Sequence, residues 1–194
     1  MSREGDSRQT IEALLSKAAS GDEHAWRGLV EAYSGRVFGL IRAQCGDADL
    51  AEEITQSTFC TIAAKIGSYT EVGRFEPWIF RIAMNRLRDE MRRRKRQARP
   101  VGDEALVGLA GTAEEPAAGE AADAERLRAL KWAMGRLSDA DQRIIHLRHH
   151  AGLSFRQIAE VLDQPLGTVL ARQHRALKKL KELMGTQIDE DEPK

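Results

Sequence analysis

Apolar residues recur at intervals of three and four along almost the whole chain, which is the spacing of one face of an α-helix. Residues 23–45, for example, place Trp26, Leu29, Val30 and Tyr33 on one side. No stretch of useful length alternates apolar and polar residues as a half-buried strand does. The predicted fold class is therefore all-α. The predicted helices cover residues about 10–20, 23–45, 49–66, 76–96, 123–136, 138–150, 154–162 and 167–184.

Residues 100–124 interrupt this pattern, because they are rich in Ala, Gly, Pro and acidic residues and show no sustained apolar period. Such a composition is typical of a flexible linker. The 194 residues are enough for one or two small domains, and the position of the linker favours two helical domains. We expect a first domain over 1–97, a flexible acidic linker over 98–124, a second domain over 125–186 and an acidic tail over 187–194.

The formal net charge of zero hides an uneven distribution of charge. Residues 80–99 carry nine basic and two acidic residues, and residues 126–184 carry twelve basic and five acidic residues. Residues 100–125, between these blocks, carry seven acidic residues and no basic one. Two basic blocks on either side of an acidic segment predict two polyanion-binding surfaces on a tether. Ordinary solvated helix faces are the alternative.

The composition excludes several classes of protein. Cys45 and Cys60 are too few for a disulfide framework or a four-ligand zinc site, and the apolar neighbours of Cys60 predict a buried side chain. No apolar run approaches the ~18 residues that a membrane span needs, and the polar start of the chain lacks the apolar core of a signal peptide. We therefore expect a cytoplasmic protein without membrane insertion.

No motif for catalysis or metal binding stands out. His146, His149 and His150 have a spacing that allows metal binding, but no acidic or cysteine partner lies near them in the sequence. Walker loops, nucleophile elbows and metalloprotease motifs are not found. We expect no catalytic residue, no metal site and no cofactor.

The strongest local pattern is a helix-turn-helix at residues 153–169. Ser154 and Gln157 match the capping-box pattern that begins a helix. Pro165 lacks an amide proton and restricts the residue before it, so the first helix is expected to end there. A second helix then opens near Gly167. A helical hairpin in a structural bundle is the alternative interpretation.

The second helix of this motif has an apolar and a basic face. Its period predicts that Val169, Leu177 and Leu180 are buried. A helix of this kind fits the major groove, with its N-terminal turns against base edges and its basic side chains near phosphates. The basic face consists of Arg172, His174, Arg175, Lys178, Lys179 and Lys181.

The first domain carries two further patterns. Residues 75–96 interleave aromatic side chains with cations and Asn85, which suits single-stranded nucleic acid because unstacked bases need flat partners and phosphates need charge. Earlier, Glu52, Glu53 and Gln56 lie on one acidic, exposed helix face. Such a face is expected to avoid DNA and to meet a basic protein, or else to be only solvated.

Three motifs, in this order along the chain, resemble those of the extracytoplasmic function (ECF) sigma factors, a class of bacterial transcription initiation factor. Residues 49–59 resemble the family's acidic helix that docks on core RNA polymerase. Residues 75–96 resemble its promoter-melting and −10-element segment, and residues 137–183 resemble its −35-binding domain. The resemblance covers about residues 10–96 and 125–184.

The resemblance implies a site for each of these tasks. The residues implied to bind the β′ subunit of core polymerase are Asp49, Glu52, Glu53 and Gln56. The residues implied to capture a flipped base of the −10 element and hold the opened strand are Tyr69, Arg74, Phe75, Trp78, Arg81, Asn85, Arg88, Arg92 and Arg93. The residues implied to read the −35 element are Thr168, Leu170, Ala171, Arg172, His174, Arg175 and Lys178.

The recognition helix departs from the family at one place. Members often carry a basic residue and a serine before the arginine that corresponds to Arg172, whereas this chain has Leu170 and Ala171. Apolar side chains can touch a thymine methyl group but cannot form a bidentate contact with guanine. The −35 preference usual in the family is therefore not expected to transfer directly.

The sequence thus predicts a non-catalytic specificity subunit, an ECF-type sigma factor that binds core RNA polymerase (β and β′ subunits) and promoter DNA and directs transcription initiation. Many members are held inactive by an anti-sigma factor, which the resemblance makes a further candidate partner. A stand-alone regulator that binds duplex DNA as a dimer and an enzyme acting on DNA are the alternatives. The acidic helix and the basic, aromatic segment together favour the sigma factor.

Overall fold

The computed structural model describes residues 2–69, 74–97 and 118–190, and every regular element in these ranges is a helix. The elements, in chain order, are α1 (Ser2–Ala19), α2 (Glu23–Cys45), α3 (Ala48–Lys65), a 3₁₀ turn η1 (Ile66–Ser68), α4 (Phe75–Gln97), α5 (Ala118–Met134), α6 (Asp139–His149), α7 (Phe155–Leu162) and α8 (Leu166–Glu190). The all-α prediction is confirmed. Within these ranges, no helix combines the length and the apolar character that crossing a membrane requires.

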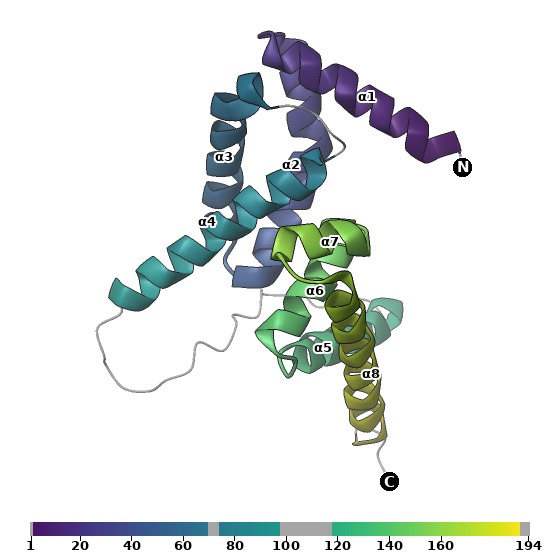
Figure 1. The fold of residues 1–194 in the computed structure, drawn as a ribbon. Coiled ribbons are helices and arrows are strands. Elements are labelled where there is room, and N and C mark those ends of the chain that lie inside the picture. Colours follow the sequence, from purple (N-terminus) through teal and green to yellow (C-terminus); the bar gives the residue numbers. More distant parts are fainter. Residues whose placement is uncertain (1, 70–73, 98–117, 191–194) are drawn as a thin grey trace.

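The helices form an N-terminal unit (α1–α4) and a C-terminal unit (α5–α8), as Figure 1 shows. The predicted boundaries are close for α2, α3, α4, α6 and α7. Three helices are longer than their apolar periods indicate. α1 starts at Ser2, and α8 runs to Glu190, into the segment assigned to the tail. α5 starts at Ala118, so residues 118–124, which were assigned to the linker, are helical.

Capping residues explain several of these boundaries. Asp22 begins α2 by accepting hydrogen bonds from the amides of His24 and Ala25, and Asp47 begins α3 by accepting one from Leu50. Such caps satisfy amides that the first helical turn leaves without partners. At the other end of α2, Gly46 adopts the left-handed conformation common at helix C-termini.

Each unit has buried side chains of its own. α2 packs against α3, and α4 crosses both. Val37, Leu40 and Ile41 of α2 and Ile79 and Phe80 of α4 are completely buried there. In the C-terminal unit, a smaller cluster joins α5, α6 and α8 through Ala133, Leu137, Ile145, Ala176 and Leu180.

The two units are also in contact. α4 packs against α7, and α2 packs against α6. Leu147, Ile158 and Val161 of the C-terminal unit belong to the same apolar cluster as the core of α2–α4. Figure 1 shows α7 on the side of the C-terminal unit that faces α4. In this structure the units therefore share a continuous apolar core.

Candidate nucleic-acid interface

The acidic face of α3 is built as the sequence predicts. Its apolar period turns Leu50, Ala51 and Ile54 inward. The predicted docking residues Asp49, Glu52, Glu53 and Gln56 are all exposed. The amide of Gln56 donates to the carboxylate of Glu52 at 3.2 Å, which orders this part of the face. The structure thus brings the four residues together on one side of one helix.

Two arginines in the last turns of α4, Arg93 and Arg94, are held by acidic side chains. Arg93 and Arg94 both donate to Glu90, with Arg93 Nε 2.6 Å and Arg94 Nε 3.0 Å from its oxygens. The hydrogen bond from Arg93, followed by that from Arg94, lowers the pKa of Glu90 below its usual value. Arg94 also donates to Asp47 at 3.0 Å. The hydrogen bond from the Leu50 amide, and then the one from Arg94, lowers the pKa of Asp47.

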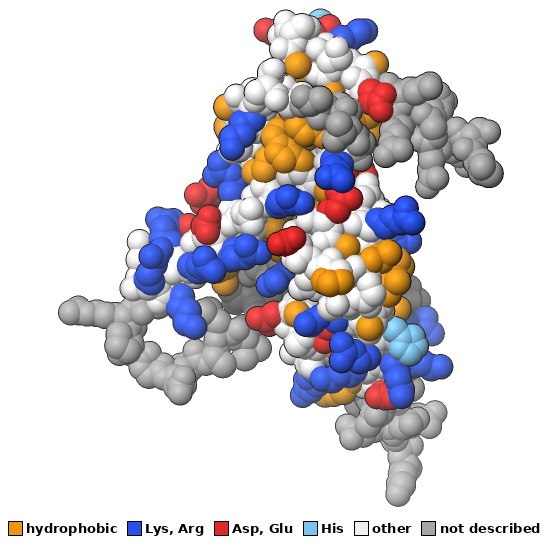
Figure 2. Space-filling model, viewed as in Figure 1, with side chains coloured by type: hydrophobic (Ala, Val, Ile, Leu, Met, Phe, Trp, Pro, Cys, Tyr) orange, Lys and Arg blue, Asp and Glu red, His pale blue; other side chains and the backbone are white. Residues whose placement is uncertain are grey.

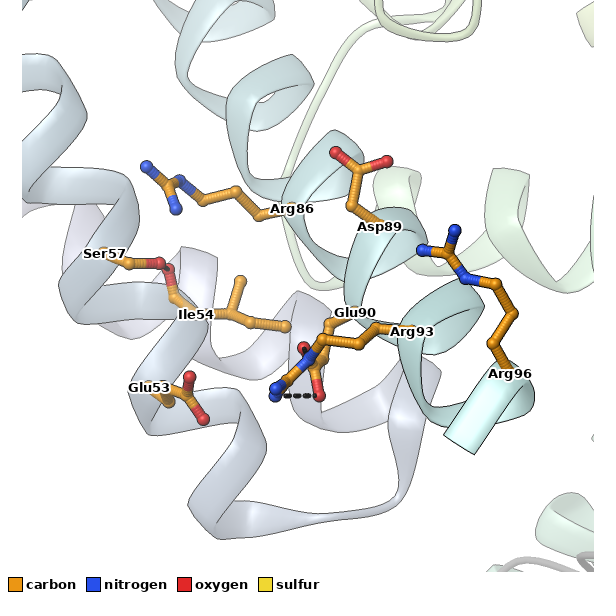
Figure 3. Close-up of a pocket in the computed structure, with 8 residues that line it drawn as sticks. All are labelled: Glu53, Ile54, Ser57, Arg86, Asp89, Glu90, Arg93 and Arg96. Carbon is orange, nitrogen blue, oxygen red and sulfur yellow. Dashed lines mark hydrogen bonds and ion pairs between the residues drawn. The ribbon is translucent and has the colours of Figure 1, made fainter. Parts of the chain in front are cut away.

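A charged pocket lies between α3 and α4, at the surface beside their contact (Figure 3). Glu53 and Ser57 on α3 face Arg86 and Arg93 on α4 across it. Figure 3 shows the Arg93 guanidinium directed to Glu90, on the α3 side of α4. Arg93, a predicted −10 contact, is therefore held beside the acidic face of α3 instead of projecting freely.

The exposed face of α4 matches the predicted DNA contacts more closely. Arg81, Asn85, Arg88 and Arg92 follow one another at intervals of three and four and are all exposed. Arg88 donates to the side-chain oxygen of Asn85 at 3.1 Å. Figure 2 shows basic side chains along α4 toward its C-terminal end and a second basic group over the C-terminal unit. The pattern fits a surface that follows a phosphate backbone.

Three aromatic side chains gather at the start of α4. The rings of Tyr69 and Trp78 stack with their centroids 4.6 Å apart, and Trp78 is half-buried. Phe75 packs edge-on against Tyr33 at 5.3 Å and is only 3% exposed. Phe75 is thus a core side chain that supports the Tyr69–Trp78 stack, and it has no surface for a base in this conformation.

The helix-turn-helix prediction is confirmed in detail. Ser154 and Gln157 form the complete capping box of α7. α7 ends at Leu162, and the φ of 52° at the following Asp163 lies in the left-handed region. The carbonyl of Pro165 accepts the first amide hydrogen bonds of α8 from Thr168 and Val169. The turn therefore depends on a left-handed aspartate as well as on the proline.

The predicted −35 residues divide into two groups. Leu170, Ala171, His174, Arg175 and Lys178 are exposed on α8. Two others are only partly exposed: Thr168 lies in the first turn, and Arg172 turns toward α6, where its guanidinium lies 3.7 Å from a carboxylate oxygen of Asp141. Arg172 therefore also braces α8 against α6.

Two predictions of burial made from the sequence are wrong. Leu177 is 46% exposed, because Val169, Gln173, Ala176 and Leu180 form the inward face of α8. Cys60 is exposed, because it continues the outward face of α3 that begins with the acidic residues. A local apolar neighbourhood in the sequence does not show which side of a helix faces the core.

The histidine cluster lies at the end of α6, near α2: His146 and His149 belong to the helix and His150 follows it. The rings of His146 and His150 are 5.4 Å apart. Burial, followed by the charges of His150 and His149, lowers the pKa of His146 to about 4. His150 lies close to Gly39 of α2, where its Nδ1 would be 3.8 Å from a Cβ. No group of three potential ligands suited to a metal ion occurs among the described residues.

A polar cluster that the sequence did not predict lies between the two units. Arg36 of α2 donates to Glu76 of α4 at 2.7 Å and to the carbonyl of Ala151, which follows α6. The other oxygen of Glu76 accepts from Gln157 of α7 at 2.7 Å. These residues are far apart in sequence, and the only local signal is a charged Arg36 beside the apolar face of α2.

Two of the predicted −10 residues also contact the C-terminal unit. Arg81 donates to the backbone carbonyl of Glu160 on α7 at 2.6 Å. Arg74 lies 3.8 Å from the carboxylate of the same residue. The N-terminal half of the α4 surface is therefore partly occupied by α7.

The fold and these surfaces define a two-unit helical protein with a helix-turn-helix and two basic faces. Comparison with protein families gives one match to each unit. The model of Sigma-70 region 2 matches residues 29–97, and that of Sigma-70 region 4 matches residues 133–182. Together they cover more than half of the chain.

Individual relatives extend the match over both units. The chain is 27% identical over 177 residues to the ECF RNA polymerase sigma factor SigW of Bacillus subtilis, covering 88% of this chain and 95% of SigW. It is 31% identical over 179 residues to the ECF RNA polymerase sigma factor SigE of Mycolicibacterium smegmatis, covering 89% of this chain and 67% of SigE. CnrH, solved in complex with the cytosolic domain of CnrY, has a similar fold with a TM-score of 0.68, 24% identity, and coverage of 91% of this chain and 98% of CnrH.

The chain belongs to the ECF RNA polymerase sigma factor family. It is a DNA-binding transcription regulator that acts with core RNA polymerase in promoter-specific transcription initiation.

Proposed function

We propose that the exposed face of α3 is where this chain docks on core polymerase. The observation that carries the proposal is the joint exposure of Asp49, Glu52, Glu53 and Gln56 on one helix face. A concentrated negative face steers and orients a basic partner surface. The same face would repel DNA, which separates the task of α3 from that of α4.

We propose that α4 and the stacked aromatic pair read the −10 element. The Tyr69–Trp78 stack offers a flat surface for an extruded base, and Arg81, Asn85 and Arg88 follow it along the exposed face of α4. Extrusion of a base costs a few kcal/mol, so a site that binds the extruded base favours strand opening. Phe75 would act from beneath, by holding Tyr69 in place.

We propose that α8 reads the −35 element in the major groove. Its first turns present Leu170 and Ala171, and the following turns present His174, Arg175 and Lys178. N-terminal residues of a recognition helix reach base edges, whereas basic residues further along contact phosphates. Arg172 contributes by fixing α8 against Asp141 of α6.

These assignments give each unit one promoter element. We propose that residues 1–97 form the polymerase-docking and −10-binding domain and that the C-terminal unit forms the −35-binding domain, with the acidic residues between them as the linker. The chain would act as a non-catalytic subunit, because none of the surfaces described above brings together a nucleophile and a base. Its place of action would be the cytoplasm, where the bacterial chromosome and polymerase are found.

We also propose a protein inhibitor as a second partner. CnrH, whose fold is similar, was solved in complex with the cytosolic domain of CnrY. Large apolar side chains remain exposed on α5 and α8 of this chain, among them Leu127, Leu130 and Leu177. Affinity purification of the chain from its native host tests this proposal, and recovery of polymerase subunits with no other stoichiometric protein would contradict it.

Run-off transcription tests the assignment as a whole. Core RNA polymerase, this chain and a genomic promoter library are expected to give discrete start sites that require the chain. Specific binding of the chain alone to duplex DNA, together with no start site on homologous core, would favour a stand-alone regulator. Single substitutions on α3, α4 and α8 then separate polymerase binding from promoter reading.

A further inference from the structure

The first two turns of α8 expose an apolar surface where a recognition helix meets base edges. Leu166 and Leu170 are 37% and 44% exposed, and Ala171 is exposed beside them. Val169 and Gln173 are buried, and Arg172 is directed to Asp141. The first exposed cation of the helix is therefore Arg175, more than two turns after its start.

This arrangement restricts what α8 can read. The major groove offers one apolar group, the C5-methyl of thymine, whereas guanine is read by hydrogen-bond donors on Arg or Lys. Leu170 and Ala171 have no such donor. We propose that Leu170 and Ala171 select thymine by contact with its methyl group, so that the −35 element of this chain is specified by thymines. This step rests on the proposed function, in which α8 reads the −35 element.

Replacement of thymine by deoxyuridine removes only the methyl group and so tests the proposal directly. A library with a randomised −35 segment is first selected with the holoenzyme. We expect thymines at the positions under the start of α8. Deoxyuridine at one of those positions is then expected to weaken holoenzyme binding about fourfold, the value of one buried methyl group.

Two variants locate the effect. Leu170→Ala is expected to remove the difference between thymine and deoxyuridine. Leu177→Ala, an equally exposed leucine further along α8, is expected to preserve it. Binding that depends on the −35 element but ignores the methyl group would overturn this inference while leaving the proposed function intact. Binding with no dependence on the −35 segment would overturn the assignment of α8 itself.

A second inference rests on a separate set of contacts, the cluster of Arg36, Glu76 and Gln157, which we call the clasp. It draws one side chain from each of three helices in the two units. The side chains of Arg36 and Glu76 are 32% and 25% exposed, so their ion pair is partly shielded from water. Arg36 also lies over the Tyr33 and Phe80 rings, 5.1 and 5.3 Å from their centroids.

The geometry around Arg36 completes the connection. Its guanidinium donates through two nitrogens to the Ala151 carbonyl. The following Gly152 has a φ of 67°, a conformation that favours glycine. The turn after α6 is therefore shaped to place a carbonyl group against α2. Charge-assisted hydrogen bonds of this kind are among the stronger ones in proteins.

The arrangement held by the clasp conflicts with promoter reading. Glu160 of α7 contacts Arg74 and Arg81, two of the residues proposed to bind the −10 element. The names of the −10 and −35 elements place them about 25 base pairs apart, which is ~85 Å at 3.4 Å per base pair. Two units packed side by side cannot reach both elements. We infer that the clasp holds the two units together in the free chain, so that Arg74 and Arg81 stay engaged by α7 and −10 DNA binds more weakly than it does to a chain whose units are apart.

The variant Gln157→Glu opens the clasp with little local damage. Glutamate preserves the capping box of α7 but places a like charge against Glu76. We expect the radius of gyration of the full chain, measured by small-angle X-ray scattering, to rise by about 3 Å or more. We expect binding of a single-stranded −10 oligonucleotide without polymerase to strengthen about tenfold, because the hydrogen bond from Gln157 to Glu76 is replaced by repulsion between two carboxylates.

The double variant Glu76→Gln with Gln157→Glu is the control, because it restores a donor opposite an acceptor. We expect it to return the radius of gyration toward the wild-type value. A wild-type chain that is already extended in solution would overturn the inference. So would a compact Gln157→Glu chain whose oligonucleotide affinity is unchanged.

Discussion

The two helices proposed to face DNA, α4 and α8, are exposed to different degrees. The first half of α4 is covered in part by α7, through Arg74 and Arg81. α8 packs on α5, α6 and α7 within its own unit, and its outward residues from Leu166 to Lys178 are exposed. The first part of the proposed −10 surface is thus engaged by the other unit in this structure, whereas the proposed −35 surface is exposed.

The chemistry of the two helices differs as well. α4 begins with aromatic residues that support a stacked pair and ends in arginines. α8 begins with exposed leucines and becomes basic after two turns. The first arrangement suits unpaired bases, and the second suits methyl groups and phosphates of a duplex. On the proposed assignments, the first unit opens the DNA and reads the −10 element, and the second unit reads the −35 element as a duplex.

The largest expected effect lies outside both DNA surfaces. Glu53→Lys reverses a charge on the exposed docking face of α3, and we expect it to weaken core-polymerase binding at least ~30-fold, corresponding to about 2 kcal/mol or more at an interface charge. The helicity should not change, because Glu53 is exposed. Fluorescence titration with core polymerase measures the loss.

Glu31→Lys on α2 is the matched control, since Glu31 is also exposed but lies on another helix. It should bind core polymerase as the wild type does. A Glu53→Lys chain with normal helicity and unchanged polymerase affinity would remove α3 from the docking surface.

A second prediction compares two neighbouring arginines of α4. Both side chains are exposed, but the guanidinium of Arg93 donates to Glu90. We expect Arg92→Ala to weaken promoter binding and to reduce the salt dependence of binding by about one phosphate contact. Arg93→Ala should have the smaller effect. Holoenzyme binding at several salt concentrations measures both, and equal salt slopes for the two variants would show that the ion pair with Glu90 opens on DNA.

A third prediction compares two arginines of α8. Arg175→Ala should weaken −35-dependent initiation about tenfold, the scale of one good base or phosphate contact, without a change in thermal stability. Arg172→Ala should also weaken it, but with a lower melting temperature, because its contact with Asp141 braces α8. Run-off transcription on promoters with and without a −35 match, beside thermal unfolding, distinguishes the two. Loss of activity in Arg172→Ala at unchanged stability would make Arg172 a direct reader.

The last prediction concerns folding stability and not promoter binding, and it is a pH dependence at α6. The folded protein lowers the pKa of His146 from 6.5 to about 4, mainly by burial. Folding therefore favours the neutral ring, and its contribution is complete above pH 6.5 and is lost as the pH falls toward 4. Thermal unfolding between pH 7 and 4 should show a decline that is smaller in His146→Gln. Identical pH profiles for the two proteins would contradict a buried neutral His146.

Local patterns were sufficient to predict most of the fold. The apolar period placed α2 at its observed bounds, and Ser154 with Gln157 marked the start of α7. These signals act over one or two helical turns, so a single sequence contains them. The acidic face of α3 was predicted for the same reason, because Glu52, Glu53 and Gln56 share one face at helical spacing.

Contacts between distant segments were not predictable. Arg36 and Ala151 are 115 residues apart, and no local pattern indicates that one will meet the other. Two helix positions also face a different side from the one predicted. Leu177, predicted to be buried, is exposed, and Phe75, predicted to contact DNA, is buried. The side that a residue faces depends on which partners its helix packs against. The engagement of Arg172 by Asp141 has the same origin.

Hydroxyl-radical footprinting of a promoter, with the chain alone and with the chain bound to core polymerase, tests the central claim most directly. For the chain alone the account predicts no pair of protected segments, because the packed units cannot reach both elements at once. With polymerase it predicts two protected segments centred about 25 base pairs apart, the upstream one lost in Arg175→Ala and both lost in Glu53→Lys. Protection of two adjacent half-sites by the chain without polymerase would contradict the account and identify a dimeric regulator.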